Sequence, residues 1–414
     1  MSTKGDLMAP LCAVTPPRHM AHLVASRSYL SYSKEELRDK LSHNPYSYVQ
    51  VIHPDVSMEM EPQRGTTDFF QEVKKAYKGF KSKGWLKASQ HPEWYIYRQQ
   101  SERGQWTGVV CNLDLALCAA GGLQTHEQTL DHRESLFASF LETVGFHAEP
   151  ILCARPDGTA EALAADKVMA SVTAQSAHTD FMTADGHRHE IWRLSASSAK
   201  GEAFGEAWRV FSKFYLADGH HRFASSLRVA SKLPDVAQAQ SILALVVPER
   251  DLTISGFHKE IREIETGTQA LLLKLEACHH LRLSPCPTPE SLPSSGEAIL
   301  LFQGQAWQLT RPSDTPYATD AHWIQEEVME GVFGITDPRD NPRLRHLPAI
   351  DHDASQWWPS EEDRLRILMP AIPFADIRKV ADASGSMPPK STWVEPKLRS
   401  AMFIHEFSQG DESP

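Results

Sequence analysis

The chain has 414 residues, 41% of them hydrophobic and 23% charged, which is typical of a globular protein with a large core divided into two lobes or domains. Its formal net charge of −11 argues against a nucleic-acid partner, because a phosphate backbone needs a basic stripe, but a local basic pocket for a small anion is compatible with it. No apolar run reaches the roughly 18 residues of a membrane span and the N-terminus lacks a signal-peptide core, so we expect no membrane partner and a cytoplasmic protein.

In chain order, residues 1–21 are expected to form a loosely ordered N-terminal tail. Beyond them, apolar residues recur with a period of about 3.6 where we expect helices, and alternate or cluster where we expect strands. The expected helices cover residues 33–41, 69–80, 135–144 and 202–212. The expected strands cover residues 48–53, 94–97, 106–110, 151–154, 214–217, 241–247, 298–302 and 306–309. This mixture predicts an α+β fold built on a mixed sheet.

A stretch rich in proline and serine, Cys286–Gly296, is typical of a linker between domains. We therefore expect a main α/β domain over residues 22–285 and a smaller C-terminal lobe over residues 297–408. The oligomeric state, a homodimer included, is left open by the sequence.

The pentapeptide Asp218-Gly219-His220-His221-Arg222 is the strongest sign of a functional site, because it joins a strand-like run to a helical run. A glycine at such a turn lets the backbone approach a ligand, and the first turn of a helix offers unpaired N–H groups to an anion. The histidines and the arginine add side-chain donors, and Asp218 could hold Mg²⁺ or take a proton. Ordinary turn chemistry before a solvated helix start is the alternative, but four chemically capable residues around one glycine favour a site.

A similar tetrapeptide, Asp185-Gly186-His187-Arg188, provides a control within the same chain. It joins two strand-like runs, Phe181–Thr183 and Glu190–Leu194. Two strands connected through Asp-Gly are typical of a β-hairpin, so the glycine is explained by the turn alone. We predict a structural role for this second copy.

Two other segments concentrate groups that can carry chemistry. The loop with His126, Glu127, Thr129 and Arg133 places acid, base and hydroxyl groups before a helix, although a solvated loop that caps the helix explains it at least as well. The extended segment 387–400 contains Lys390-Ser391-Thr392, which resembles the end of a Walker A loop but lacks its glycines. Anion binding and a structural strand both stay open for that segment.

Taken together, the motifs resemble those of one family, domain of unknown function 1015. His126-Glu127-x-Thr129, Ala217–Arg222 and Met387–Ser400 follow one another in the family's order, and the resemblance covers residues 22–407. The Asp-Gly-His-His-Arg element is similar to the turn with which the ParB/sulfiredoxin superfamily grips nucleotide phosphates. Archaeal free serine kinase, a member of that superfamily, has a closely similar turn. The resemblance implies a ParB/sulfiredoxin-like strand–turn–helix phosphate site in the main domain.

This resemblance implies a nucleotide-dependent kinase of a small hydroxyl metabolite, with L-serine as the leading acceptor and ATP or ADP with Mg²⁺ as cofactors. Such an enzyme needs phosphate donors, a metal ligand and an acceptor base. The implied roles are phosphate binding for Gly219, His220, His221, Arg222, Lys390, Ser391 and Thr392, metal binding for Asp218, catalysis for Asp218, Glu127 and His126, and substrate binding for Arg27, Thr129, Arg133, Lys397 and Arg399.

Two alternatives to a kinase remain at this point: a nucleotide-binding regulatory module without catalysis, and a small-molecule phosphohydrolase. The chain also departs from many relatives, which have a Pro-Pro-Tyr-Asp stretch near the N-terminus where this chain reads Val24–Tyr29. If that tyrosine–aspartate pair handles substrate in the relatives, Arg27 and Tyr29 do something different here, and the acceptor stays open.

Overall fold

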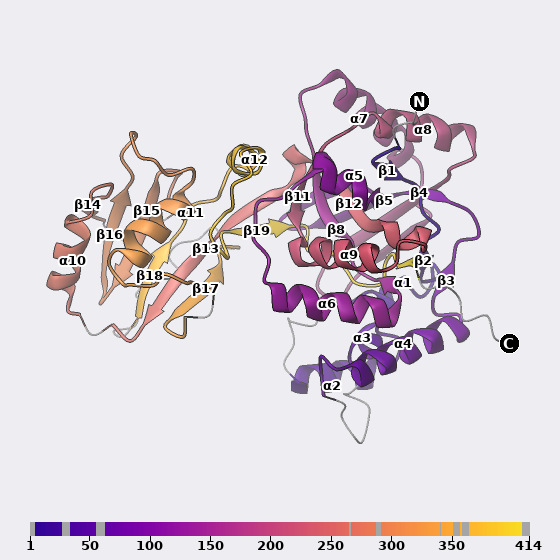
Figure 1. Ribbon diagram of the computed structural model, residues 1–414, viewed down its shortest axis with the longest axis horizontal. Helices are drawn as coiled ribbons and strands as arrows, with labels where there is room; N and C mark the ends of the chain where they lie inside the picture. The colour runs from indigo at the N-terminus through magenta and orange to yellow at the C-terminus, as the bar shows by residue number, and fades with distance from the viewer. Residues whose placement is uncertain are drawn as a thin grey trace. The chain divides into compact units, whose positions relative to one another are not determined.

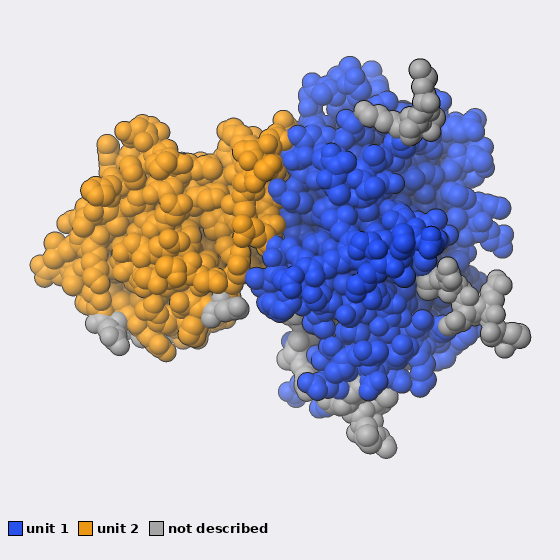
Figure 2. Space-filling view, in the orientation of Figure 1, with its two compact units in different colours: residues 1–125, 129–252, 396–414 blue, residues 126–128, 253–395 orange. Residues whose placement is uncertain are grey.

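The computed structural model describes residues 5–26, 34–54, 63–264, 266–286, 291–339, 341–350, 357 and 364–407 (Figure 1). The chain forms two compact units (Figure 2): unit 1 comprises Met1–Thr125, Thr129–Leu252 and Pro396–Pro414, and unit 2 comprises His126–Gln128 and Thr253–Glu395. The main boundary therefore follows Leu252, and the segment expected to be a linker, Cys286–Gly296, lies inside unit 2. The last residues return to unit 1.

Unit 1 is built on a nine-stranded mixed sheet in the order β6-β11-β8-β12-β5-β4-β10-β9, with β1 also paired to β5. Strand β12 is parallel to β8 and antiparallel to β5, and it is buried almost throughout, as its continuous apolar sequence predicts. The strands are β1 Met8–Ala9, β4 Glu93–Ser101, β5 Gly104–Asp114, β6 Leu123–Gln124, β8 Ile151–Arg155, β9 Thr179–Met182, β10 Arg188–Ser195, β11 Phe214–Asp218 and β12 Ser241–Pro248. Two further pairs join β2 Val14–Thr15 to β3 Lys87–Ala88, and β7 Phe146–His147 to β20 His405–Glu406.

The helices of unit 1 bury the apolar stripes that their sequences predict. In α4, Phe69, Phe70, Val73, Tyr77 and Phe80 are buried on one face, and Figure 1 shows α6 and α9 packed side by side. The helices are α1 Ala21–Val24, α2 Lys34–His43, α3 Val49–Ile52, α4 Thr67–Ser82, α5 Leu115–Leu117, α6 Asp131–Val144, α7 Ala160–Thr173, α8 Ala199–Arg209 and α9 His220–Lys232, with a π-helical turn at Cys118–Gly122 and 3₁₀ turns at Ala237–Gln240 and Glu249–Asp251.

The strand expected over residues 48–53 is wrong, because this segment forms the short helix α3. Its backbone N–H groups bond locally, from Val51 to the Tyr48 carbonyl at 2.9 Å and from His53 to the Val49 carbonyl at 2.8 Å. The alternating buried residues that indicated a strand are buried on a single helical turn instead. Short apolar runs are ambiguous in this way because their period is read over too few residues.

Unit 2 is built on a seven-stranded sheet in the order β14-β16-β15-β18-β13-β17, with β19 also paired to β13. The expected hairpin at residues 298–309 is confirmed as β15 and β16. The elements are β13 Thr253–Arg262, α10 Thr268–Glu276, β14 Arg282–Pro285, β15 Glu297–Phe302, β16 Gln305–Thr310, α11 Asp320–Trp323 with a π-helical continuation at Ile324–Glu330, β17 Leu344–Pro348, β18 Arg364–Leu368, α12 Phe374–Asp382 and β19 Thr392–Glu395. Across the described parts of both units, no helix has the length and apolar character needed to cross a membrane.

Candidate functional site

The predicted strand–turn–helix is present at Asp218–Arg222. Strand β11 is an interior strand between β6 and β8, it ends at Asp218, and α9 begins at His220. Gly219 connects them with φ of 102°, in the region that side chains rarely adopt. A Cβ at this position would lie 2.9 Å from Cγ2 of Ile151 and 3.0 Å from Nε of Arg222. Glycine therefore allows the backbone conformation of this turn and also leaves room for the Arg222 side chain.

Replacing Gly219 by Ala is expected to destabilise unit 1 by about 1–3 kcal/mol, because the left-handed conformation and the crowding at Ile151 add together. Gly186 is the matched control, since it has φ of 77° but no atom within 4 Å of the place that a Cβ would occupy. Gly186→Ala should show backbone strain alone, and denaturant unfolding of both variants measures the difference. Equal losses of stability would show that the approach at Gly219 is not crowded.

Asp218 forms an ion pair with Lys397, which arrives from the segment that follows unit 2. The Lys397 Nζ lies 3.0 Å from Oδ2 of Asp218, and about 40% of each side chain is exposed. Burial raises the pKa of the Asp218 carboxyl, but the charges of Lys397 and Arg222 outweigh it and lower the pKa to about 2. Asp218 is therefore ionised at neutral pH and already surrounded by positive charge.

Arg222 is held by a carboxylate that the sequence did not reveal. Its NH1 lies 2.6 Å from Oε2 of Glu149, and Oε1 of the same carboxylate accepts a hydrogen bond of 2.6 Å from the Ser400 hydroxyl. Ser400 is itself fixed, since its N–H donates to the Ser26 carbonyl at 3.0 Å. Glu149 thus orients Arg222 and attaches the C-terminal segment beside it.

The second Asp-Gly copy is confirmed as a hairpin and has an additional contact. Thr183 and His187 close the turn between β9 and β10 through a backbone hydrogen bond of 2.9 Å. Asp185 in this turn also pairs with Arg399, whose side chain is buried. Lys397 and Arg399 are two residues apart, so their Cα atoms lie within about 7 Å. One short segment therefore connects both Asp-Gly turns of unit 1.

The first histidine of the motif, His220, does not add a positive charge to the turn. His220, the first residue of α9, is buried, and burial lowers its pKa to about 4 despite the neighbouring Asp218 carboxylate. The imidazole is therefore neutral at physiological pH, so one ring nitrogen donates a hydrogen bond and the other accepts one. His221 is partly buried, and its carbonyl accepts a bond of 2.7 Å from Ser225.

The other predicted residues are distributed over both units. Thr129 bonds to Glu134 within unit 1, Arg133 is exposed on α6, and Arg27 lies outside the described residues. His126 and Glu127 belong to unit 2, where the His126 carbonyl accepts from the Met387 N–H at 2.7 Å.

Lys390, Ser391 and Thr392 also belong to unit 2, and their contacts there are structural. The Lys390 carbonyl accepts from Nζ of Lys259 at 3.0 Å, and the buried Ser391 hydroxyl donates to the Pro388 carbonyl at 2.5 Å. Thr392 begins β19. Of the two interpretations left open for this segment, these contacts support the structural one.

Among the described residues, no three His, Cys, Asp or Glu side chains come together as a metal site. The residues that sequence reasoning missed are Glu149 and Asp185. Glu149 stands alone before Pro150 and β8, so no local pattern marks it. Asp185 is recognisable in the sequence as a turn residue, but its partner Arg399 lies 214 positions away.

Comparisons with solved structures find distant similarities. A mutant of free serine kinase in complex with ADP has a TM-score of 0.39 and 11% identity, over 71% of this chain and 92% of that one. SbnI with a C-terminal truncation, from Staphylococcus aureus, has a TM-score of 0.39 and 10% identity, over 71% and 87%. A conserved hypothetical protein from Pyrococcus furiosus has a TM-score of 0.37 and 12% identity, over 71% and 94%.

No curated protein matches this chain. A family model described as protein of unknown function (DUF1015) matches residues 8–332. This match spans well over half of the chain and includes two of the three motifs that carry the resemblance, whereas Met387–Ser400 lies beyond it. The protein therefore belongs to the DUF1015 family.

Proposed function

We propose that this protein transfers a phosphoryl group from ATP or ADP to the hydroxyl of a small metabolite, with L-serine as the first acceptor to test. One observation carries the proposal: unit 1 brings together an ionised Asp218, a left-handed glycine that opens a helix, and the cations Arg222 and Lys397. Phosphoryl transfer depends mainly on positioning and electrostatic stabilisation, and this arrangement offers both.

The phosphate groups would bind at the start of α9. The dipole of a helix favours negative charge at its first turn, where the backbone N–H groups point toward a bound anion. Arg222 would add a bidentate donor, and Glu149 holds its guanidinium in position. A bound phosphate would have to share Arg222 with Glu149 or displace Glu149 from it. Phosphate binding should therefore weaken when salt is added, because ions screen the attraction and anions compete for Arg222.

Asp218 fits a Mg²⁺ ion that is bound mainly through the nucleotide. Mg²⁺ commonly takes one or two protein carboxylates, with phosphates and water completing its shell. Asp218 supplies one ionised and partly exposed carboxylate, and Lys397 is the neighbour that would have to move or share it. Bound Mg²⁺ would neutralise charge on the phosphates, while the protein orients them.

The residues that would bind and activate the acceptor are proposed from the side-chain chemistry that each role requires. Glu127 is proposed as the base that accepts the hydroxyl proton, with His126 beside it in sequence, because a carboxylate is the residue type that this role requires. Lys397 is the accessible cation for an acceptor carboxylate, whereas Arg399 is buried and already paired with Asp185. Thr129 and Arg133 complete the proposed substrate set.

The direct test incubates the protein with Mg²⁺, ATP or ADP, and a mixture of serine, threonine, homoserine and glycerate. Mass spectrometry should detect a gain of one phosphate, first on L-serine. Glu127→Ala is expected to lower turnover by about 10²–10⁴-fold while nucleotide affinity stays nearly unchanged, because an acceptor base acts in the transition state.

Two outcomes of this test would select an alternative. Tight nucleotide binding with no phosphorylated acceptor would identify a regulatory nucleotide-binding module. Release of inorganic phosphate in the absence of every acceptor would identify a phosphohydrolase. Glu142→Ala is a control for Glu127→Ala, because Glu142 is an acid of α6 that pairs with the exposed Lys232 at 2.6 Å and has no role in the proposed site.

A further inference from the structure

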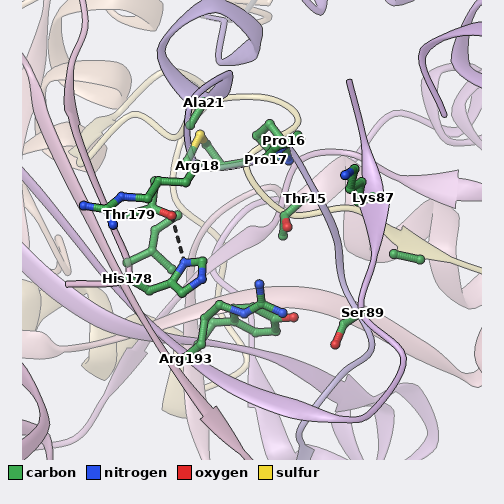
Figure 3. Close-up of a pocket in the computed structure, with 14 residues that line it drawn as sticks. Thr15, Pro16, Pro17, Arg18, Ala21, Lys87, Ser89, His178, Thr179 and Arg193 are labelled. Carbon is green, nitrogen blue, oxygen red and sulfur yellow. Dashed lines mark hydrogen bonds between the residues drawn. The ribbon is translucent and has the colours of Figure 1, made fainter. Parts of the chain in front are cut away.

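A cavity of about 250 Å³ lies in unit 1, and no residue of the Asp218 turn lines it (Figure 3). Its walls come from strands β4 and β10, near the opposite end of the sheet order from β11, and from segments around β2, β3 and β9. In Figure 3, Thr15, Lys87 and Ser89 lie on one side of the cavity, His178 and Thr179 lie on the other, and Arg193 lies below. None of these residues takes part in the function proposed above.

The residues that line this cavity include three permanent cations and no carboxylate. They are Arg18, Lys87 and Arg193. Glu93, just outside the lining, accepts a hydrogen bond of 2.9 Å from Nε of Arg193 and offsets that charge. Arg18 and Lys87 are exposed and form no ion pair with any described residue. The cavity lining therefore has an excess of positive charge, which the Asp180 carboxylate near Arg18 offsets in part.

The pKa of His178 reflects the charges around the cavity. Burial lowers the pKa of its imidazole, and the charges of Arg193 and Arg18 lower it further while Glu93 opposes them, so both guanidinium groups act on this ring. Its Nδ1 lies 3.1 Å from the Thr179 hydroxyl, which fixes the ring. With a neutral imidazole and nearby hydroxyl groups, the cavity offers neutral donors in addition to its cations.

From this arrangement we infer that the cavity binds the phosphate monoester of a small metabolite. A phosphate monoester carries about −1.5 to −2 charges on one compact group, which matches the excess positive charge, whereas a single carboxylate would leave one cation uncompensated. The volume is below the roughly 300 Å³ at which pockets for drug-sized ligands begin, so a nucleotide is too large and a small ester fits. This inference does not depend on the kinase activity.

Calorimetric titration with O-phospho-L-serine and with glycerol 3-phosphate tests the inference. The double variant Arg18→Ala, Lys87→Ala should bind at least tenfold more weakly than the unchanged protein, and it should keep its melting temperature because both side chains are exposed. The double variant Lys167→Ala, Lys200→Ala, which removes two exposed lysines from α7 and α8, is the charge-matched control and should bind normally.

Arg222→Ala separates this cavity from the turn at Gly219. Retained ester binding in Arg222→Ala would support the cavity, and loss of binding there would assign the ester to the turn instead. Equal affinity for L-serine and its phosphate ester, or for inorganic phosphate and the esters, would overturn the inference. So would unchanged affinity in the double variant.

Discussion

The Asp218→Asn protein is expected to lose phosphoryl-transfer turnover by on the order of 10²-fold, the effect typical of removing one preorganised electrostatic group. Asparagine keeps the size of the side chain but cannot serve as an anionic metal ligand. It also releases Lys397 from its ion pair. Added Mg²⁺ should therefore strengthen nucleotide binding in the unchanged protein and fail to do so in the variant. Titrations of nucleotide with Mg²⁺ and with a chelator measure both effects.

The fold should survive this change, because a partly exposed ion pair contributes only about 0–1 kcal/mol. Asp180→Asn is a closely matched control, since Asp180 pairs with Arg188 at 2.8 Å and has the same 40% side-chain exposure as Asp218. Asp180 belongs to the β9–β10 hairpin, so Asp180→Asn should change neither the turnover nor the effect of Mg²⁺ on nucleotide binding. If the two variants lose turnover equally, Asp218 has no special role.

Arg222→Ala is expected to abolish the stabilisation that nucleotide confers. A ligand at 100 times its dissociation constant stabilises by about 2.7 kcal/mol, which corresponds to a rise of a few degrees in melting temperature for a chain of this size. No neutral side chain replaces a bidentate donor to phosphate, and Arg222→Lys should restore only part of the shift. Thermal unfolding with and without ATP or ADP measures the effect.

The second Asp-Gly copy provides the control for the Arg222→Ala prediction. Arg188 ends the Asp185-Gly186-His187-Arg188 copy, where it is exposed and paired with Asp180. Arg188→Ala removes the same charge from the same local sequence and should leave the full nucleotide shift. A full shift in Arg222→Ala would place the nucleotide elsewhere, and a lost shift in both variants would indicate a general effect of charge.

The Asp-Gly turns were predictable because their signals are local. An apolar run, a glycine and a helical run stand next to one another at 214–232, and each specifies its own backbone conformation. The hairpin at Asp185–Arg188 follows from the same kind of signal. The failure at 48–53 has the converse reason, since so short an apolar run satisfies a strand and a helical turn equally well.

Sequence alone therefore determined the α+β class, the strand–turn–helix at Gly219 and the family to which the three motifs belong. Only the tertiary structure decided which charges meet. Lys397 and Asp218 are 179 positions apart, Arg399 and Asp185 are 214 apart, and Arg222 and Glu149 are 73 apart. No periodicity or turn rule spans such separations, because these pairs depend on the arrangement of the sheet and on the return of the C-terminal segment to unit 1. The electrostatics of the candidate site are a property of that assembly.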